Sequence, residues 1–214
     1  ERDWSAYVYA YVTRRLPEIY ETQIRKHMNV VLDAIAFLDS AGAEAVRLIY
    51  GADTRGVTYV QKMRWPTADF KVQIAVLDSL YNRIVQREVE TRLRADSSSL
   101  YLTPYPLIGT YTVTLPKGSH IAAVSLRSLS NQAAGNATST VHVRDMKSRL
   151  ALSDIELRFD EDGPPNPSHI FLERSRVFMD FEVYNLACDS DGLYRADVSY
   201  CLNAGQAGKH SPRG

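Results

Sequence analysis

The sequence lacks most of the features that reveal a reaction or a nucleic acid partner. Its two cysteines, Cys188 and Cys201, fit neither a disulfide framework nor the four ligands of a structural zinc site. Its 25 basic and 25 acidic residues balance, so the chain has no general attraction to nucleic acid phosphates. No apolar run approaches the roughly 20 residues needed to span a bilayer. We therefore expect no zinc module, no nucleic acid partner and no membrane span within this chain.

Catalytic motifs are also missing. A nucleophilic serine usually lies in a Gly-x-Ser-x-Gly turn, and Ser153, which precedes Asp154, has neither glycine. A Ser-Asp pair before an apolar strand more often forms turn or cap bonds to the backbone. We therefore predict a structural role for Ser153 and no enzymatic activity.

Metal and cofactor sites are not predicted either. The five histidines are scattered and include no His-Glu-x-x-His pair, and no glycine-rich phosphate loop is present. The acidic segments at Asp160–Gly163 and Asp189–Gly192 could bind calcium, but Asp-Gly pairs are also ordinary in tight turns. We interpret both as turns and expect no cofactor. The histidines are His27, His120, His142, His169 and His210.

What the sequence does have is apolar residues at alternating positions. In the clearest segment, Phe70–Asp78, Phe70 and three further apolar residues share one face, while Lys71 and Gln73 take the other. Eight short segments of this kind, separated by turns, predict a mainly β protein with an antiparallel, immunoglobulin-like β-sandwich. They are Val30–Leu38, Ala45–Gly51, Val57–Met63, Phe70–Asp78, Arg83–Leu93, Gly109–Pro116, His120–Leu129 and Ser139–Asp145. The predicted core contains Phe70, Val72, Ile74, Val76, Tyr111, Val113 and Leu115.

Breaks in these patterns divide the chain. We predict an N-terminal helix and linker at 1–26, a β-sandwich domain at 27–149, a second, smaller or incomplete β-domain at 150–203, and a flexible tail at 204–214. Gly163–Ser168 contains three prolines and must be a loop. After it, Arg176–Leu186 and Leu193–Asn203 are predicted to form a hairpin about Asp189–Gly192. Such a hairpin would hold Cys188 and Cys201 over ~20 Å apart, too far for a disulfide.

The N-terminal segment is rich in aromatic residues. Trp4, Tyr7 and Tyr11 would line one side of a short amphipathic helix, although Tyr7 and Tyr11 also fit a strand. Because so short a helix is unstable alone, it must dock on something. We expect these three residues to bind a partner protein; the alternative is that they pack on the chain's own sandwich.

Two C-terminal motifs resemble a known family. The segment Leu150–Leu157 ("LALSDIEL") and the aromatic strand Val177–Leu186 ("VFMDFEVYNL") are similar to the β-rich C-terminal region of bacterial Gly-Trp-x-Thr-Asp (GWxTD) domain proteins. The name-giving motif itself is absent from this chain. The resemblance implies an exported, periplasmic or otherwise extracytoplasmic protein. The sequence begins at Glu1 and not at Met, so we also expect a segment upstream of Glu1, for which a membrane anchor is one option. The resemblance assigns no catalytic residue.

From these features we expect a non-enzymatic, exported β-sandwich protein. It would serve as a structural or accessory interaction subunit of a multiprotein complex in the cell envelope or at a membrane. Two alternatives stay open. One is a carbohydrate- or small-ligand-binding module with exposed aromatic residues on a sheet face, and the other is a hydrolase whose residues converge from distant strands.

Overall fold

The computed structural model describes residues 27–62, 65–94, 105–171 and 176–199. Within them the chain is mainly β, its strand pairs are antiparallel, and no helix occurs. The described residues therefore contain no helix that is long and apolar enough to cross a membrane. The helix predicted around Trp4, Tyr7 and Tyr11 lies outside the described residues.

The larger sheet has five strands. They are β3 (Val60–Lys62), β4 (Trp65–Asp78), β5 (Arg83–Arg94), β7 (Gly118–Ser128) and β8 (Ala134–Val143). Strand β4 is central, with β5 along one edge and β7 along the other. Thr67 of β4 pairs with Arg94 of β5 on one side and with Val60 of β3 on the other. Strand β3 therefore lies on the edge of β4 opposite β5, which is the edge that β7 also uses. Strand β8 pairs with the far edge of β7.

The second sheet has three strands. Strand β2 (Glu44–Ala52) lies between β1 (Val30–Leu38) and β6 (Leu107–Thr114). A tight turn joins β1 to β2: the carboxylate of Asp39 accepts hydrogen bonds from the N–H groups of Ala41 and Ala43. Each of the eight predicted strand segments thus coincides with a strand, although β3 is described only over three residues.

One hydrophobic cluster joins the two sheets. Alternate residues of β4 enter it, so the predicted register is confirmed: Phe70 and Val72 are fully buried, whereas Lys71 pairs with Glu88 at 2.7 Å on the other face. Of the other predicted core residues, Leu115 is buried, while Tyr111 and Val113 are half-buried against the cluster. The largest fully buried members of the cluster are Phe70, Met28, Leu48, Ile74, Leu126, Met146, Val46, Val72, Val76 and Val124.

A close backbone approach links the sheets at one corner. The N–H of Met28 donates to the carbonyl of Ala134 at 2.9 Å, where the chain entering β1 runs parallel to the start of β8. A Cβ on the next residue, Gly135, would lie 1.9 Å from the carbonyl oxygen of Met28. Only glycine fits at this position, because the obstacle is backbone.

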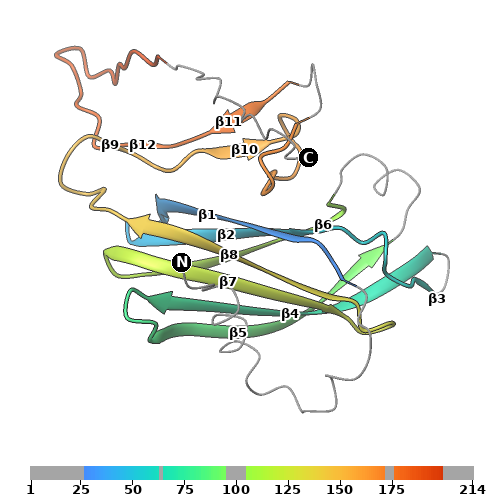
Figure 1. Cartoon of the computed structure of the whole chain (residues 1–214). Coiled ribbons are helices and arrows are strands. Elements are labelled where there is room, and N and C mark those ends of the chain that lie inside the picture. The colour runs from blue at the N-terminus through green and yellow to red at the C-terminus, as the bar shows by residue number, and fades with distance from the viewer. Residues whose placement is uncertain (1–26, 63–64, 95–104, 172–175, 200–214) are drawn as a thin grey trace, which may run out of the picture.

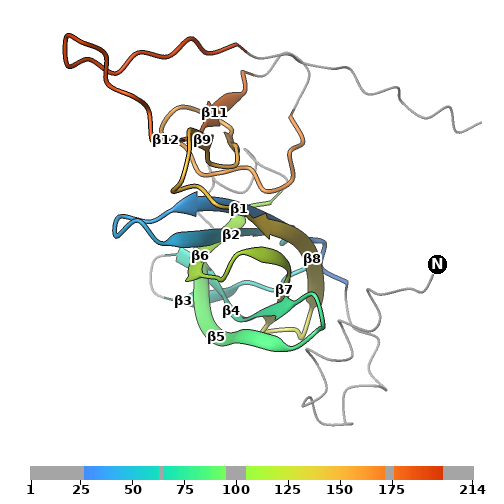
Figure 2. The ribbon, with the colours of Figure 1, turned by 90° about the vertical axis from the view of Figure 1, so that its left-hand side faces the viewer.

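The C-terminal residues form a third layer. Strands β9 (Ala151–Leu152) and β10 (Glu156–Arg158) pair with β12 (Val183–Tyr184) and β11 (Phe178–Asp180), respectively. We call residues 151–158 and 178–184 the C-terminal ribbon. Figures 1 and 2 show that it lies against the β1–β2 side of the three-stranded sheet, on the face away from the five-stranded sheet. The β1–β2 sheet is therefore the middle layer.

The predicted C-terminal hairpin is wrong. Residues 178–184 pair with the preceding segment 151–158 instead of with Leu193–Asn203, whose described residues 193–199 contain no strand. Only its tight turn is present: the carboxylate of Asp189 accepts from the N–H groups of Asp191 and Leu193, and a single bridge joins Cys188 to Tyr194. Cys188 is a free, exposed thiol. Cys201 lies outside the described residues, so the absence of a Cys188–Cys201 bridge stays a prediction.

Candidate functional site

The C-terminal ribbon contains a β-bulge that turns one carboxylate toward the body of the protein. Leu152 pairs with Val183, and the N–H of Ser153 donates to the carbonyl of Glu182, but Glu156 pairs with Asp180. Two residues, 154 and 155, therefore face a single residue, 181. A bulge of this kind re-aims the side chains beside it.

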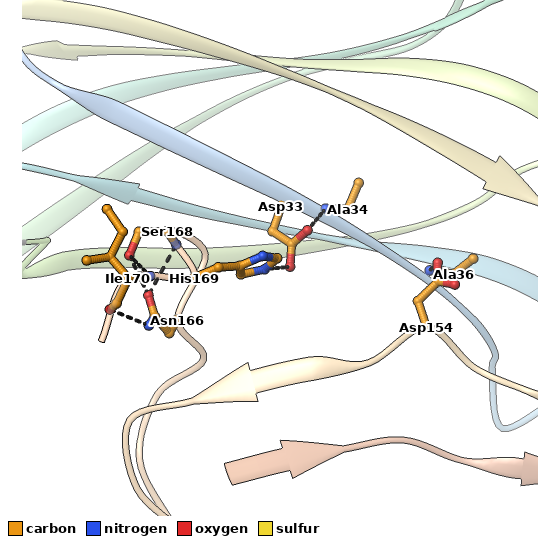
Figure 3. Close-up of polar contacts among 8 residues, drawn as sticks. All are labelled: Asp33, Ala34, Ala36, Asp154, Asn166, Ser168, His169 and Ile170. Carbon is orange, nitrogen blue, oxygen red and sulfur yellow. Dashed lines mark hydrogen bonds and ion pairs between the residues drawn. The ribbon is translucent and has the colours of Figure 1, made fainter. Parts of the chain in front are cut away.

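Asp154, in the bulge, binds the free edge of β1. Its carboxylate accepts from the N–H of Ala36 at 2.8 Å, and its own N–H donates to the carbonyl of Ala36 at 2.9 Å (Figure 3). The second carboxylate oxygen pairs with Arg144 at 2.7 Å. One residue thus satisfies both backbone groups of Ala36 that a neighbouring strand would otherwise use.

Two further side chains occupy the same edge of β1. Asp33 accepts from the N–H of Ala34 at 2.9 Å, and the Tyr184 hydroxyl accepts from the N–H of Leu38 at 2.9 Å. The Tyr184 hydroxyl also donates to Glu182 at 2.7 Å; burial, together with this bond, raises the pKa of Tyr184 to about 12. Because an unpaired strand edge can template pairing with another chain, these contacts close the edge of β1 to a second strand.

The proline-rich loop holds the other end of the ribbon against the sheet. Nε2 of His169 lies 2.9 Å from Oδ2 of Asp33, and Asn166 organises the loop through bonds to Ser168 and Ile170 (Figure 3). A Cβ on Gly51 of β2 would come within 3.1 Å of Pro167. The loop therefore packs directly on the middle sheet. Residues 163–168 form no strand, as their three prolines predict.

Beneath the ribbon lies a chain of alternating charges. Glu156, which is buried, pairs with Arg47 of β2 at 2.8 Å and with Arg158 at 3.0 Å. Nε of Arg158 also lies against Asp180, in ion contact and without hydrogen-bond geometry. The Arg47 guanidinium lies over the ring of Phe37, 4.9 Å from its centre. Because a buried charge is destabilising when its partner is removed, the pairing of Glu156 with Arg47 ties the ribbon to β2.

The ribbon presents its polar face to the protein. Residues directly opposite each other in an antiparallel pair have their side chains on the same face. Glu156 contacts β2 and Tyr184 contacts β1, so their partners Asp180 and Ala151 share this inner face.

The outer face of the ribbon is apolar. Leu152 pairs with Val183, and Leu157 pairs with Met179. Each of these residues is next to an inner-face residue in the chain, so its side chain lies on the opposite, outer face. Of the sixteen large apolar side chains that are exposed among the described residues, eleven belong to 150–198. The ribbon members of that group are Leu152, Ile155, Met179, Phe181 and Val183. A concentrated apolar surface of this kind marks an interaction site.

A pocket of about 460 Å³ opens between the ribbon and the middle sheet. The sheet contributes Ile35, Phe37 and Arg47, and the ribbon contributes Ser153, Asp154, Glu156, Arg158, Met179, Asp180, Phe181 and Glu182. The residues that line it include no histidine. Four carboxylates against two guanidiniums make its lining acidic.

Of the residues weighed for chemistry, Ser153 has the structural contacts that we predicted. Its hydroxyl donates to the carbonyl of Asp154 and accepts from the N–H of Glu182, both at 2.8 Å. It joins β9 to β10 and does not open a strand. His142 is exposed opposite Val141 and Val143, as its position in the alternation predicts. Among the described residues, no three His, Cys, Asp or Glu side chains are grouped closely enough to hold a metal ion.

Several residues of the site escaped prediction from the sequence. Asp154 binds the edge of β1, and Asp33 pairs with His169, each across more than a hundred residues of chain, and no local pattern indicates such partners. The strand itself is predicted within Arg176–Leu186, but its two different faces are not, although the sequence carries a signal for them. In Val177–Tyr184 apolar residues alternate with Asp180 and Glu182, which is the pattern of a strand with one polar and one apolar face. The predicted partner-binding residues Trp4, Tyr7 and Tyr11 lie outside the described residues.

Comparisons of the chain with protein-family models, with curated proteins and with solved structures gave no match.

Proposed function

We propose that the protein is a non-enzymatic interaction subunit that binds another protein through the apolar outer face of its C-terminal ribbon. The observation that carries this proposal is the orientation of the ribbon. Its charged face is docked on the middle sheet, and its apolar face is left to solvent. A two-stranded ribbon gains little stability by itself, and apolar side chains in water cost free energy that burial in an interface recovers.

The remaining parts of the proposal rest on other features. Two sheets that share one hydrophobic cluster support an immunoglobulin-like sandwich as the scaffold. The similarity of Leu150–Leu157 and Val177–Leu186 to GWxTD proteins supports an exported protein that assembles in the cell envelope. We extend the proposed interface to Trp4, Tyr7 and Tyr11, which as aromatic residues suit a partner surface.

A second candidate function is the binding of a small ligand. The pocket beneath the ribbon, at about 460 Å³, is within the range of small-molecule sites, and Phe37 of the middle sheet is among its lining residues. Its floor, however, is occupied by ion pairs between its own residues. The apolar outer face has no such internal partner, and we therefore rank protein binding first.

The proposal is tested by site-specific photo-crosslinking of the full-length chain in cells that make it. A photoreactive phenylalanine analogue at Met179 or Val183 is expected to give one discrete crosslinked product. The same analogue at Glu90, which is exposed on β5, is the control and is expected to give none. Equal crosslinking at all three positions, or none at any, would overturn the proposal.

A further inference from the structure

The strand formed by residues 178–184 has an open edge. Strands β11 and β12 each belong to a two-stranded sheet, and no other described strand pairs with them. Glu182 directs its N–H to Ser153 Oγ and its carbonyl to the Ser153 N–H, both within the ribbon. Because backbone groups alternate along a strand, the neighbouring residues Phe181 and Val183 direct theirs to the open edge.

The side chains beside this edge define what could pair with it. On the outer face, the exposed side chains of Met179, Phe181 and Val183 would pack beside apolar side chains of an added strand. On the inner face, Asp180 is already paired with Arg158, but the carboxylate of Glu182 has only the Tyr184 hydroxyl as its partner among the described residues. Both acids line the pocket, which has room for a further side chain.

A second copy of this chain suits the edge poorly. If the whole of 178–184 paired with itself in antiparallel register, Asp180 of each copy would face Glu182 of the other. Like charges directly opposite each other destabilise a strand pair. The edge is therefore better matched by a segment with basic residues at these positions.

We propose that the edge of β11 and β12 binds an extended segment of a partner protein by strand addition, and that apolar and basic residues alternate in this segment. The inference rests on the proposed function and specifies its partner. Backbone bonds to Phe181 and Val183 give the register. The apolar residues of the segment widen the outer face, and a lysine or arginine enters the pocket to pair with Glu182.

The test uses the full chain and a labelled synthetic peptide of about nine alternating valine and lysine residues, the length of an ordinary strand. Fluorescence anisotropy is expected to show binding, and a valine–glutamate peptide of equal length is expected not to bind. Amide exchange is expected to slow at Phe181 and Val183 when the peptide is added. Glu182→Gln is expected to weaken binding about threefold, because an exposed ion pair contributes modestly.

Val183→Pro isolates the backbone contribution. Proline removes the N–H that faces the open edge, a position at which edge strands tolerate it, so the fold is expected to survive. Peptide affinity is expected to fall by about tenfold or more. Val198→Pro, at an exposed valine outside the ribbon, is the matched control and is expected to bind normally. If Val183→Pro unfolds the protein, the amide exchange measurement decides in its place.

Failure of this inference differs from failure of the proposed function. If crosslinking at Met179 persists in the Val183→Pro protein, the partner binds the apolar face without strand addition, and only this inference falls. Four other outcomes would each overturn this inference. They are equal binding of both peptides, dimerisation of the protein alone, sedimentation with vesicles of anionic lipid, and peptide binding that appears only after residues 1–26 are removed. Loss of the crosslink at every position overturns both.

Discussion

Single side chains close the exposed edge of β1. Asp33, Asp154 and Tyr184 each place an oxygen on one of the three N–H groups that a new strand would need. A buried donor without an acceptor costs more than its hydrogen bond is worth, so each oxygen matters when it is removed. Ser153 has the same role inside the ribbon, where it satisfies Glu182.

Substitution of Ser153 tests the structural role predicted from the sequence. Ser153→Ala removes the acceptor of the partly buried N–H of Glu182 and is expected to lower the free energy of unfolding by about 1–3 kcal/mol. Urea denaturation measures this change. Ser40→Ala, at an exposed turn serine, is the control and should stay within about 0.5 kcal/mol of wild type. An enzymatic activity that disappears with Ser153→Ala would refute the structural role.

The raised pKa of Tyr184 predicts that the ribbon's contribution to stability falls at alkaline pH. Its pKa is raised from 10.0 to about 12 in the folded protein, so folding favours the protonated phenol. The stability that this group contributes is therefore complete below pH 10 and is lost as the pH rises to about 12. The difference in unfolding free energy between wild type and Tyr184→Phe, measured with urea across this range, is expected to shrink. Tyr194→Phe, at an exposed tyrosine, should give a difference that does not change in this way.

At the scale of elements, the bulge makes the ribbon fit the sheet. Without the extra residue Ile155, Asp154 would face Phe181 on the solvent side of the ribbon, while Glu156 would keep its place. The bulge therefore lets one strand contact the edge of β1 and the face of β2 together.

Deletion of Ile155 tests this function of the bulge. The N–H of Ala36 is expected to lose its acceptor and to exchange roughly tenfold faster, whereas that of Leu38, which binds Tyr184, should change less. Amide exchange followed by NMR reports both sites in one sample. Ile155→Ala keeps the residue count and should leave both rates unchanged. Equal acceleration at Ala36 and Leu38 would mean that the whole ribbon had detached.

The sequence predicted the strands far better than their C-terminal pairing. A strand such as β4 can be predicted from the alternation between Phe70 and Val76, because the apolar residues of this local pattern are the ones that the fold buries. Pairing is a long-range property: Val177–Tyr184 alternates equally well beside either of its neighbours in the chain. The turn at Asp189–Gly192 favoured the wrong one. What decides the pairing is Asp154 bound to Ala36 and Glu156 bound to Arg47, and both contacts depend on distant residues.

At the scale of the whole molecule, the ribbon covers part of the middle sheet. Ile35 and Ile49 are buried, at 5% and 1% exposure, yet neither belongs to the hydrophobic cluster between the two sheets. They lie on the other face of β1 and β2, under the third layer. Folding of the predicted 27–149 domain is therefore coupled to the C-terminal layer, which comprises the ribbon and the proline-rich loop, through these side chains.

A chain that ends at Arg149 is expected to be less stable than the full protein and to aggregate. Exposure of each isoleucine costs about 1.5–3 kcal/mol, and the edge of β1 loses Asp154 and Tyr184 at the same time. Thermal unfolding and size-exclusion chromatography measure both effects. Replacement of Ile35 and Ile49 by threonine in the truncated chain should restore solubility without restoring stability, since threonine suits an exposed sheet face. An unchanged melting temperature after truncation would instead show that the ribbon is an independent unit whose contacts with β1 contribute nothing to folding.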